Sequence, residues 1–499
     1  MAKQPKGPPK GRRYIGGKET VGYILFDWAG GFDIGDMGEV FLSRVLNLDL
    51  GMRALIDTFI KGPWDVVNDL WFSAVIDKTR TRFGKFRPYL LLSLLAGVPF
   101  KLFYYIMPFL FWGTPPAYGP KLVAYAVLAV LSEASGTFNQ FSSGGMLATI
   151  TPDMYERTRL ITLNNFVQNF TMKKLPAYIF DAVVTYLNFS GMEDSVTLLK
   201  LRNICLVFGV GTASLAALAA IYFAVVARER VPQSINQPKL RDSVKAIMQN
   251  KPLLLLSLTR LFGTFNIGGD GEYTYYQAVL KFPLGVTLVG IPGVLTGFLV
   301  YPYIPWARER FSTRALWLVG SHVRPMLGIA VYFLGLINNN FTNMWVILPI
   351  IAIWEATWTP LLKMRDIVER DLLNECMDYG EWKTGLRDEA KINALAGIAS
   401  KISNYAFNGI NIWLRSKIGF KTGIDYTNQP LHVQRFVWGM FTFFPAVTGN
   451  IFSMIPKFFY NISRQDREQM YEDLKLRRAT LSREITAAVQ EAEPARTSP

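Results

Sequence analysis

The chain has 499 residues, of which half are hydrophobic and 18% are charged, against about 25% charged residues in ordinary soluble domains. Its formal net charge of +15 would suit a polyanionic partner such as nucleic acid. The basic residues, however, gather in short segments between long apolar runs. This distribution indicates membrane topology and argues against a nucleic-acid-binding protein.

Long apolar runs recur from residue 21 to residue 460. Several approach the roughly 20 residues that a helix needs to cross a hydrocarbon layer about 30 Å thick, and we expect about twelve spans. Basic residues follow the even-numbered spans and occupy both ends of the chain, whereas the odd-numbered connections carry few. The pattern predicts a multi-pass protein of the plasma (inner) membrane with both termini in the cytoplasm.

The apolar regions fall into two related halves. Residues 32–39 (FDIGDMGE) and 265–272 (FNIGGDGE) are identical at five of eight positions. Parallel repeats of six spans are typical of secondary transporters, with the binding site between the halves near the midplane. The expected parts are a basic cytoplasmic tail (1–20), a six-helix bundle (21–227), a cytoplasmic linker (228–250), a second six-helix bundle (251–460) and a cytoplasmic C-terminal tail (461–499).

The first expected span, about residues 21–43, is unusually acidic. It contains Asp27, Asp33, Asp36 and Glu39. Acidic side chains inside a span are costly and usually face a water-filled interior. The alternative is that this segment is not buried in the membrane at all.

The second expected span carries charges at a spacing of four. Arg53, Asp57, Lys61, Asp65 and Asp69 follow one another at this interval, which stacks side chains on one side of a helix. Burial and mutual repulsion disfavour both charges of the Asp65–Asp69 pair, and a bound Na⁺ or proton relieves this. The sequence therefore predicts a cation site there. A structural ion-pair ladder with Lys61 and Asp57 is the alternative.

Two charged connections are candidates for gating. Residues 77–89 predict a tight cationic turn in which Gly84 allows the bend. Residues 378–389 interleave opposite charges and are expected to form a loop suited to closing a cytoplasmic gate. The alternatives are a purely topogenic turn and an ordinary solvated loop. The candidate gating residues are Asp77, Arg80, Arg82, Asp378, Glu381 and Arg387.

Lys401 is the only charged residue between Lys391 and Arg415, in an otherwise apolar or neutral span. A lone ammonium group inside a membrane must find a partner. The alternative is that its long side chain reaches the membrane surface.

The remaining reactive residue types predict no further chemistry. Cys205 and Cys376 are the only cysteines, so no disulfide framework is expected. His322 and His432 are isolated, and a metal site or a histidine base has no support. The polar, basic N-terminus shows no signal peptide.

The motifs at these positions resemble those of the glycoside–pentoside–hexuronide:cation symporters, the melibiose-permease-like branch of the major facilitator superfamily. The matching segments are 64–69, 77–89, 378–387 and, more weakly, 149–157. The resemblance covers most of residues 20–470 and keeps the order of the spans. It implies an all-α polytopic fold with about twelve transmembrane helices in two pseudo-symmetric six-helix bundles, and solute uptake coupled to Na⁺, Li⁺ or H⁺ rather than an enzymatic activity.

The resemblance also implies roles for individual residues. Lys401 matches a lysine near sugar and cation, and Asp33 lies within one residue of a sugar-binding acid. Trp354 could stack on a sugar face, with packing inside its helix as the alternative. The implied cation ligands are Asp65, Asn68, Asp69 and Thr137, and the implied substrate ligands are Asp33, Asp36, Gln140, Asn165, Lys401 and Trp354.

The sequence departs from the family pattern at several positions. Leu70 and Ser73 replace a proline and a glycine of the second-span motif. Gln140 stands where the family has an acid that holds sugar hydroxyls, and Asn165 where it has an arginine. This amide pair still hydrogen-bonds hydroxyl groups, but it removes the basis for expecting a galactoside.

We therefore expect a secondary active symporter for a glycoside or related sugar, functional as a monomer and without a cofactor beyond the coupling cation. A carrier of lysolipids or other amphiphiles is the alternative within transport. A polytopic transferase or a non-transporting sensor would need a sizeable extramembrane loop, and the sequence offers none.

Overall fold

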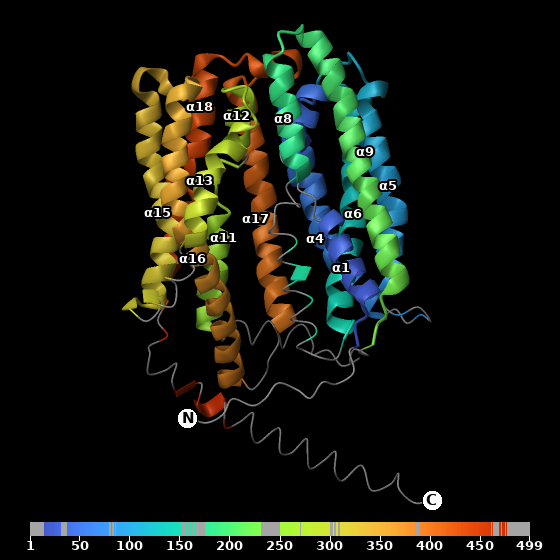
Figure 1. Ribbon diagram of the computed structural model, residues 1–499, viewed down its shortest axis with the longest axis vertical. Coiled ribbons are helices and arrows are strands. Elements are labelled where there is room, and N and C mark those ends of the chain that lie inside the picture. The colour runs from blue at the N-terminus through green and yellow to red at the C-terminus, as the bar shows by residue number, and fades with distance from the viewer. Residues whose placement is uncertain are drawn as a thin grey trace, which may run out of the picture. The chain divides into compact units, whose positions relative to one another are not determined.

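The structure is a computed structural model and is entirely helical in its described parts (Figure 1). An isolated bridge between Thr81 and Gly84 is the sole β-type pairing among those residues. The all-α fold expected from the sequence is confirmed. The structure describes residues 14–30, 37–78, 86–151, 175–230, 250–269, 271–299, 311–384 and 389–460, together with single positions between and beyond these ranges.

The helices follow the apolar runs closely. In the first half of the sequence they are α1 (Gly17–Gly30), α2 (Met37–Val40), η1 (Phe41–Val45), α3 (Leu50–Ile56), η2 (Asp57–Lys61), α4 (Gly62–Lys78), α5 (Arg87–Leu110), α6 (Gly119–Thr149), α8 (Leu175–Phe189) and α9 (Asp194–Val226). In the second half they are α11 (Lys251–Gly263), α12 (Gly271–Ala278), α13 (Gly285–Leu299), α15 (Thr313–Leu336), η5 (Ile337–Thr342), α16 (Met344–Thr384), α17 (Glu389–Ile418), η6 (Gly423–Thr427), α18 (Leu431–Thr442), α19 (Phe444–Val447) and α20 (Gly449–Phe458).

Several of these helices are long and apolar enough to cross a membrane. Among the described residues, five helices meet this criterion, and α18 with the following helical segment, bent by 44°, would add a sixth. The five are Arg87–Leu110, Gly119–Asn139, Asp194–Val226, Thr313–Thr342 and Met344–Asp366. The chain is thus a multi-pass membrane protein.

The helices group into two compact units. Unit 1 comprises Met1–Ile235, Asp270–Thr287 and Asn408–Val437, and unit 2 comprises Asn236–Gly269, Leu288–Phe407 and Trp438–Pro499. Unit 1 therefore combines most of the first half of the sequence with two pieces of the second half. One piece holds α12, and the other holds the C-terminal part of α17. Boundaries between the units fall within α13, α17 and α18.

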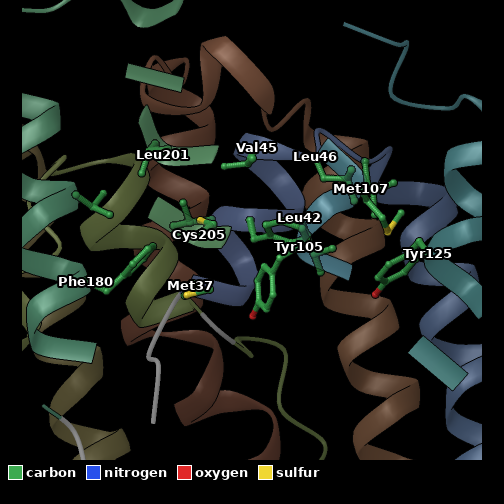
Figure 2. Close-up of a cluster of buried hydrophobic side chains, with 14 of the residues drawn as sticks. Met37, Leu42, Val45, Leu46, Tyr105, Met107, Tyr125, Phe180, Leu201 and Cys205 are labelled. Atoms are coloured by element: carbon green, nitrogen blue, oxygen red, sulfur yellow. The ribbon is translucent and has the colours of Figure 1, made fainter. Parts of the chain in front are cut away.

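Unit 1 is built on α5, which packs against α6 and α9, while α1 packs against α9 and α4 against α6. A cluster of buried apolar side chains joins η1, α5, α6, α8 and α9; Figure 2 shows Leu42, Tyr105, Tyr125, Phe180 and Cys205 among its members. Cys205 and Cys376 are both free, in agreement with the expectation of no disulfide.

Glycine permits the close approach of α5 and α9. An added Cβ atom at Gly209 would lie 2.1 Å from the ring of Tyr105, whereas nothing lies within 4 Å of the corresponding position at Gly211. Small residues let membrane helices approach closely, and overpacking such a contact costs about 1–3 kcal/mol.

We expect Gly209→Ala to lower the free energy of unfolding by about 1–3 kcal/mol, because the ring of Tyr105 is buried and has little room to move. Gly211→Ala on the same helix is the matched control and should be neutral or stabilising by up to about 1 kcal/mol. Thermal unfolding of the two purified variants measures both. Equal stability of the two variants would contradict the prediction.

The first two spans contain turns of π-helix. Residues 41–45 (η1) and 57–61 (η2) each form one such turn, and η2 lies between α3 and α4 without a break in the helix. A π turn adds a residue and rotates everything beyond it relative to an ideal α-helix. Charges spaced four apart from residue 53 to residue 69 therefore do not form one straight row, although residues within α4 share a face as expected.

Unit 2 is built on the pairs α15–α16 and α11–α20. Glycines again mark the close contacts: an added Cβ at Gly320 would lie 2.9 Å from the carbonyl oxygen of Leu361, and one at Gly328 would meet the ring of Trp354 at 3.1 Å. The charged segment expected as a loop at 378–389 is different in the structure. Residues 378–384 are helical and form the C-terminal end of α16. At 41 residues, this helix is far longer than a single span requires.

Candidate functional site

The predicted cation ligands lie on neighbouring helices of unit 1. Asp65, Asn68 and Asp69 occupy α4 at positions i, i+3 and i+4, which places them on one helix face, and Thr137 lies on α6. Asn68 Nδ2 donates a hydrogen bond of 2.7 Å to Thr137 Oγ1, and Thr137 Oγ1 donates one of 3.4 Å to Asp69 Oδ1. The structure therefore brings together three of the four predicted side chains directly, and the fourth lies one turn away on the same helix.

Three of these four side chains are taken out of solvent, and Asp69 is half-buried. Asp65 and Thr137 are each 2% exposed and Asn68 is fully buried. Asn68 Oδ1 is buried and accepts no hydrogen bond within the described part of the chain. Buried polar atoms are normally satisfied, so an acceptor left open beside two carboxylates marks a place for a cationic or hydrogen-bonding ligand.

The donor set determines which ligand fits. Two carboxylates, an amide oxygen and a hydroxyl are hard oxygen ligands of the kind that alkali and alkaline-earth cations prefer. No group of three or more His, Cys, Asp or Glu side chains suited to a metal ion occurs among the described residues. With two negative charges, the set suits a monovalent cation or a proton.

An ion pair lies one helical turn before this site. Lys61 Nζ is 3.6 Å from Glu133 Oε2, and these residues precede Asp65 and Thr137 by four positions each. Both side chains are about a quarter to a third exposed. Lys61 is the last residue of the π turn at 57–61, and its ion pair with Glu133 connects this turn to α6. Asp57, the first residue of the turn, pairs with Arg53.

The first span meets the fifth through an acid and an amide. Asn164 Nδ2 donates a hydrogen bond of 2.7 Å to Asp27 Oδ2. Asp33, Asp36 and Asn165 lie outside the described residues, and Gln140 lies on α6 with its side chain outside the described set. The predicted substrate ligands of unit 1 therefore remain predictions, and Asp27 and Asn164 join them as described neighbours.

The substrate candidates of unit 2 lie on α16 and α17. Lys401 lies on α17 and is half-buried. Trp354 is buried, donates a hydrogen bond of 3.3 Å from Nε1 to the carbonyl oxygen of Arg324, and packs against Phe441 at a ring distance of 5.5 Å. Packing, the alternative for Trp354 that the sequence left open, thus accounts for its described contacts.

A membrane-embedded ion pair beside Trp354 was missed by sequence reasoning. Arg324 Nη2 lies 3.0 Å from Glu355 Oε1, and the guanidinium of Arg324 stacks 4.2 Å from the centre of the Trp358 ring. Trp358 Nε1 donates to Glu355 Oε2 at 2.8 Å. The available signal was a single charge in each of two apolar runs, one in α15 and one in α16.

The gating candidates are only partly described. Gly84 has a φ of +107°, so the bend predicted at this glycine is confirmed. Glu229 Oε1 accepts hydrogen bonds from the backbone N–H groups of Phe86 and Arg87, where a negative charge favours the start of α5. Asp77 is the penultimate residue of α4, and Asp378 and Glu381 lie on α16. Arg80, Arg82 and Arg387 lie outside the described residues.

Helices long and apolar enough to span a membrane, with acidic side chains buried on them, define a multi-pass membrane protein. The family model described as MFS/sugar transport protein matches residues 23–464. The chain belongs to this family, and the resemblance to the glycoside–pentoside–hexuronide branch of the major facilitator superfamily is confirmed.

Relatives of known name match most of this chain. The glucuronide carrier protein homolog of Escherichia coli (strain K12) is 25% identical over 394 residues, which cover 77% of this chain and 80% of that protein. A lactose permease of Lactobacillus helveticus is 22% identical over 468 residues, which cover 91% of this chain and 68% of the permease.

Solved structures share the fold at low identity. The crystal structure of a D-xylose-proton symporter matches with a TM-score of 0.55 and 13% identity, covering 89% of this chain and 95% of that chain. The inward-open xylose transporter XylE from E. coli matches with a TM-score of 0.53 and 14% identity, covering 92% and 98%. These similarities establish the major facilitator fold.

Proposed function

We propose that this protein is a secondary active symporter that couples uptake of a glycoside or related sugar to a Na⁺ or H⁺ gradient. The observation that carries the proposal is the group formed by buried Asp65, Asn68 and Thr137 with half-buried Asp69, in which Asn68 Oδ1 has no described partner. Such a group favours an occupying cation, because two nearby carboxylates in a low-dielectric setting repel each other.

Occupancy of this site would then determine which states of the transporter are accessible. A cation that binds Asp65 and Asp69 lowers the cost of burying both acids, and it favours a state able to bind substrate. The two halves of the repeat then alternate in exposing the midplane site to either side of the membrane. The membrane potential assists inward cation movement by about 2.3 kcal/mol per charge per 100 mV.

The substrate assignment is supported by the family and by the first and fifth spans. Relatives are named for glucuronides and lactose, and the family is one of sugar transporters. An acid and an amide in contact, Asp27 and Asn164, are the kind of groups that hydrogen-bond sugar hydroxyls.

The basic segments between spans support a location in the plasma (inner) membrane with both termini cytoplasmic, and we propose a monomer.

The test is uptake by the purified protein in liposomes. A panel of neutral and acidic sugars is offered while Na⁺ and pH gradients are imposed separately, and empty liposomes provide the background. We expect accumulation of at least one sugar above its equilibrium level under one of the two gradients. Equilibration of sugars with no response to either gradient would contradict symport, and transport of a lysolipid alone would replace the sugar assignment.

A further inference from the structure

A second buried charge cluster lies in unit 1, where the first span connects to the second. Glu39 on α2 accepts a hydrogen bond of 2.6 Å from Ser43 Oγ through Oε1, and its Oε2 lies 2.7 Å from Arg53 Nη1. Arg53 Nε lies 3.6 Å from Asp57 Oδ2. The other carboxylate oxygen of Asp57, Oδ1, accepts a hydrogen bond of 2.7 Å from the hydroxyl of Tyr125. Tyr125 belongs to the apolar cluster of unit 1 (Figure 2). All of these groups come from the first half of the sequence.

Glu39 is also bound by an arginine from the second half. Arg415, near the end of α17, places Nη1 3.1 Å from Glu39 Oε1, and the same nitrogen donates to Thr274 Oγ1 on α12 at 3.1 Å. The Arg415 side chain is 2% exposed and Thr274 is fully buried. We call Glu39, Arg53, Thr274 and Arg415 the Glu39 latch, because its contacts join the two halves of the repeat inside unit 1.

Neutral contacts that also join the two halves accompany the latch within unit 1. Thr422 Oγ1 donates a hydrogen bond of 2.7 Å to Asn47 Oδ1. The backbone N–H of Leu284 donates to Thr185 Oγ1 at 3.1 Å. The latch is thus the charged member of a set of contacts, each between a residue before 190 and one after 270.

We infer that the Glu39 latch closes the transport path at this end, and that Arg415 must leave Glu39 each time the path opens there. The inference rests on the proposed function, since alternating access requires the two halves to separate at each end in turn. Arg415 and Glu39 belong to different halves, so this separation breaks their ion pair.

The two sides of the latch differ in what separation leaves behind. Glu39 keeps its bonds to Arg53 and Ser43, both in its own half, so its charge stays paired. Arg415 keeps, among its described hydrogen bonds, only the one to the neutral hydroxyl of Thr274. A buried charge without a counter-ion is strongly unfavourable, so opening requires water to reach Arg415, and closing is favoured by its return to Glu39.

A cross-link tests whether this end must open. In the variant Asn47→Cys/Thr422→Cys, a short bifunctional thiol reagent should join the two loops, because the native side chains are in hydrogen-bond contact. We expect the cross-link to lower sugar flux in liposomes by about tenfold or more, with recovery after dithiothreitol. The single-cysteine variants treated with the same reagent are the controls. Complete cross-linking with unchanged flux would overturn the inference.

Replacement of the arginine tests the ion pair itself. Ala278, buried one turn beyond Thr274 on α12, is replaced by cysteine as a reporter for a membrane-impermeant maleimide. We expect Arg415→Gln to raise the rate of labelling about tenfold, and Arg415→Lys to restore slow labelling. Arg365→Gln is the matched control, because the ion pair of Arg365 with the adjacent Asp366 lies within one half of the sequence.

The labelling rate distinguishes a gating role of the Glu39 latch from a purely stabilising one. It also tests the latch independently of the symport proposal. Loss of thermal stability in Arg415→Gln at an unchanged labelling rate would show a structural role alone and overturn the inference. Labelling requires no transport, so a lack of gradient-driven uptake in the unmodified protein would contradict symport while the labelling result still decides whether Arg415 holds this end closed.

Discussion

Asp65→Asn and Asp69→Asn are each expected to abolish cation-driven sugar accumulation, lowering it about tenfold or more toward the background of empty liposomes. Either change removes one of the two negative charges of the buried group while nearly preserving side-chain shape. A cation then meets one carboxylate in place of two, and the gain from binding it falls. Uptake under an imposed Na⁺ or pH gradient measures the effect.

Matched measurements distinguish loss of coupling from loss of folding. Asp194→Asn, an exposed acid in the first turn of α9, is the control and should accumulate sugar normally. Downhill exchange of sugar across the liposome membrane should persist in the Asp65 and Asp69 variants, since their loss concerns the gradient. Normal accumulation in both variants would remove Asp65 and Asp69 from the coupling site.

The membrane class, the helical fold and the α4 part of the site could be predicted from sequence because each follows from local spacing. Asp65, Asn68 and Asp69 share a face by helical geometry alone. The bend at Gly84 followed from the ability of glycine to adopt a positive φ. The contact with Thr137 on α6 was implied by the family resemblance, and the structure places its hydroxyl within 2.7 Å of Asn68.

Local spacing failed where the backbone departs from an ideal helix or where charge was taken to mean a loop. The π turn at 57–61 breaks the row of charges from Arg53 to Asp69, and a period of 3.6 residues does not reveal such a turn. Residues 378–384 are strongly charged yet helical, and they extend α16 beyond the length of one span. Polar composition therefore did not indicate the backbone conformation of this segment.

Contacts of the first span with distant segments could not be predicted from the sequence. Arg415 and Glu39 are 376 positions apart, and nothing in the sequence selects this partner over other acids of the first span. The hydrogen bond between Asn164 and Asp27, which are 137 positions apart, was likewise not indicated by the sequence. Such pairings depend on how the helices pack.

Arg53→Met is expected to be the most destabilising single change in unit 1. Arg53 lies between Glu39 and Asp57, at 2.7 and 3.6 Å, and all three residues are more than nine-tenths buried. Removing one member of a buried ion pair leaves an uncompensated charge and costs about 3–5 kcal/mol. Thermal unfolding of the purified protein measures the loss, with Arg365→Met, at a half-exposed pair on α16, as a control that should change stability little.

A second substitution tests whether charge or lost packing causes this effect. Asp57→Asn removes the stranded charge but keeps an oxygen for the hydroxyl of Tyr125, so Arg53→Met/Asp57→Asn should recover about 1 kcal/mol or more relative to Arg53→Met. Glu39 retains Arg415 in both variants, which confines the comparison to Asp57. If the double variant is as unstable as the sum of the single changes, the side chain of Arg53 stabilises unit 1 through its packing and not through its charge.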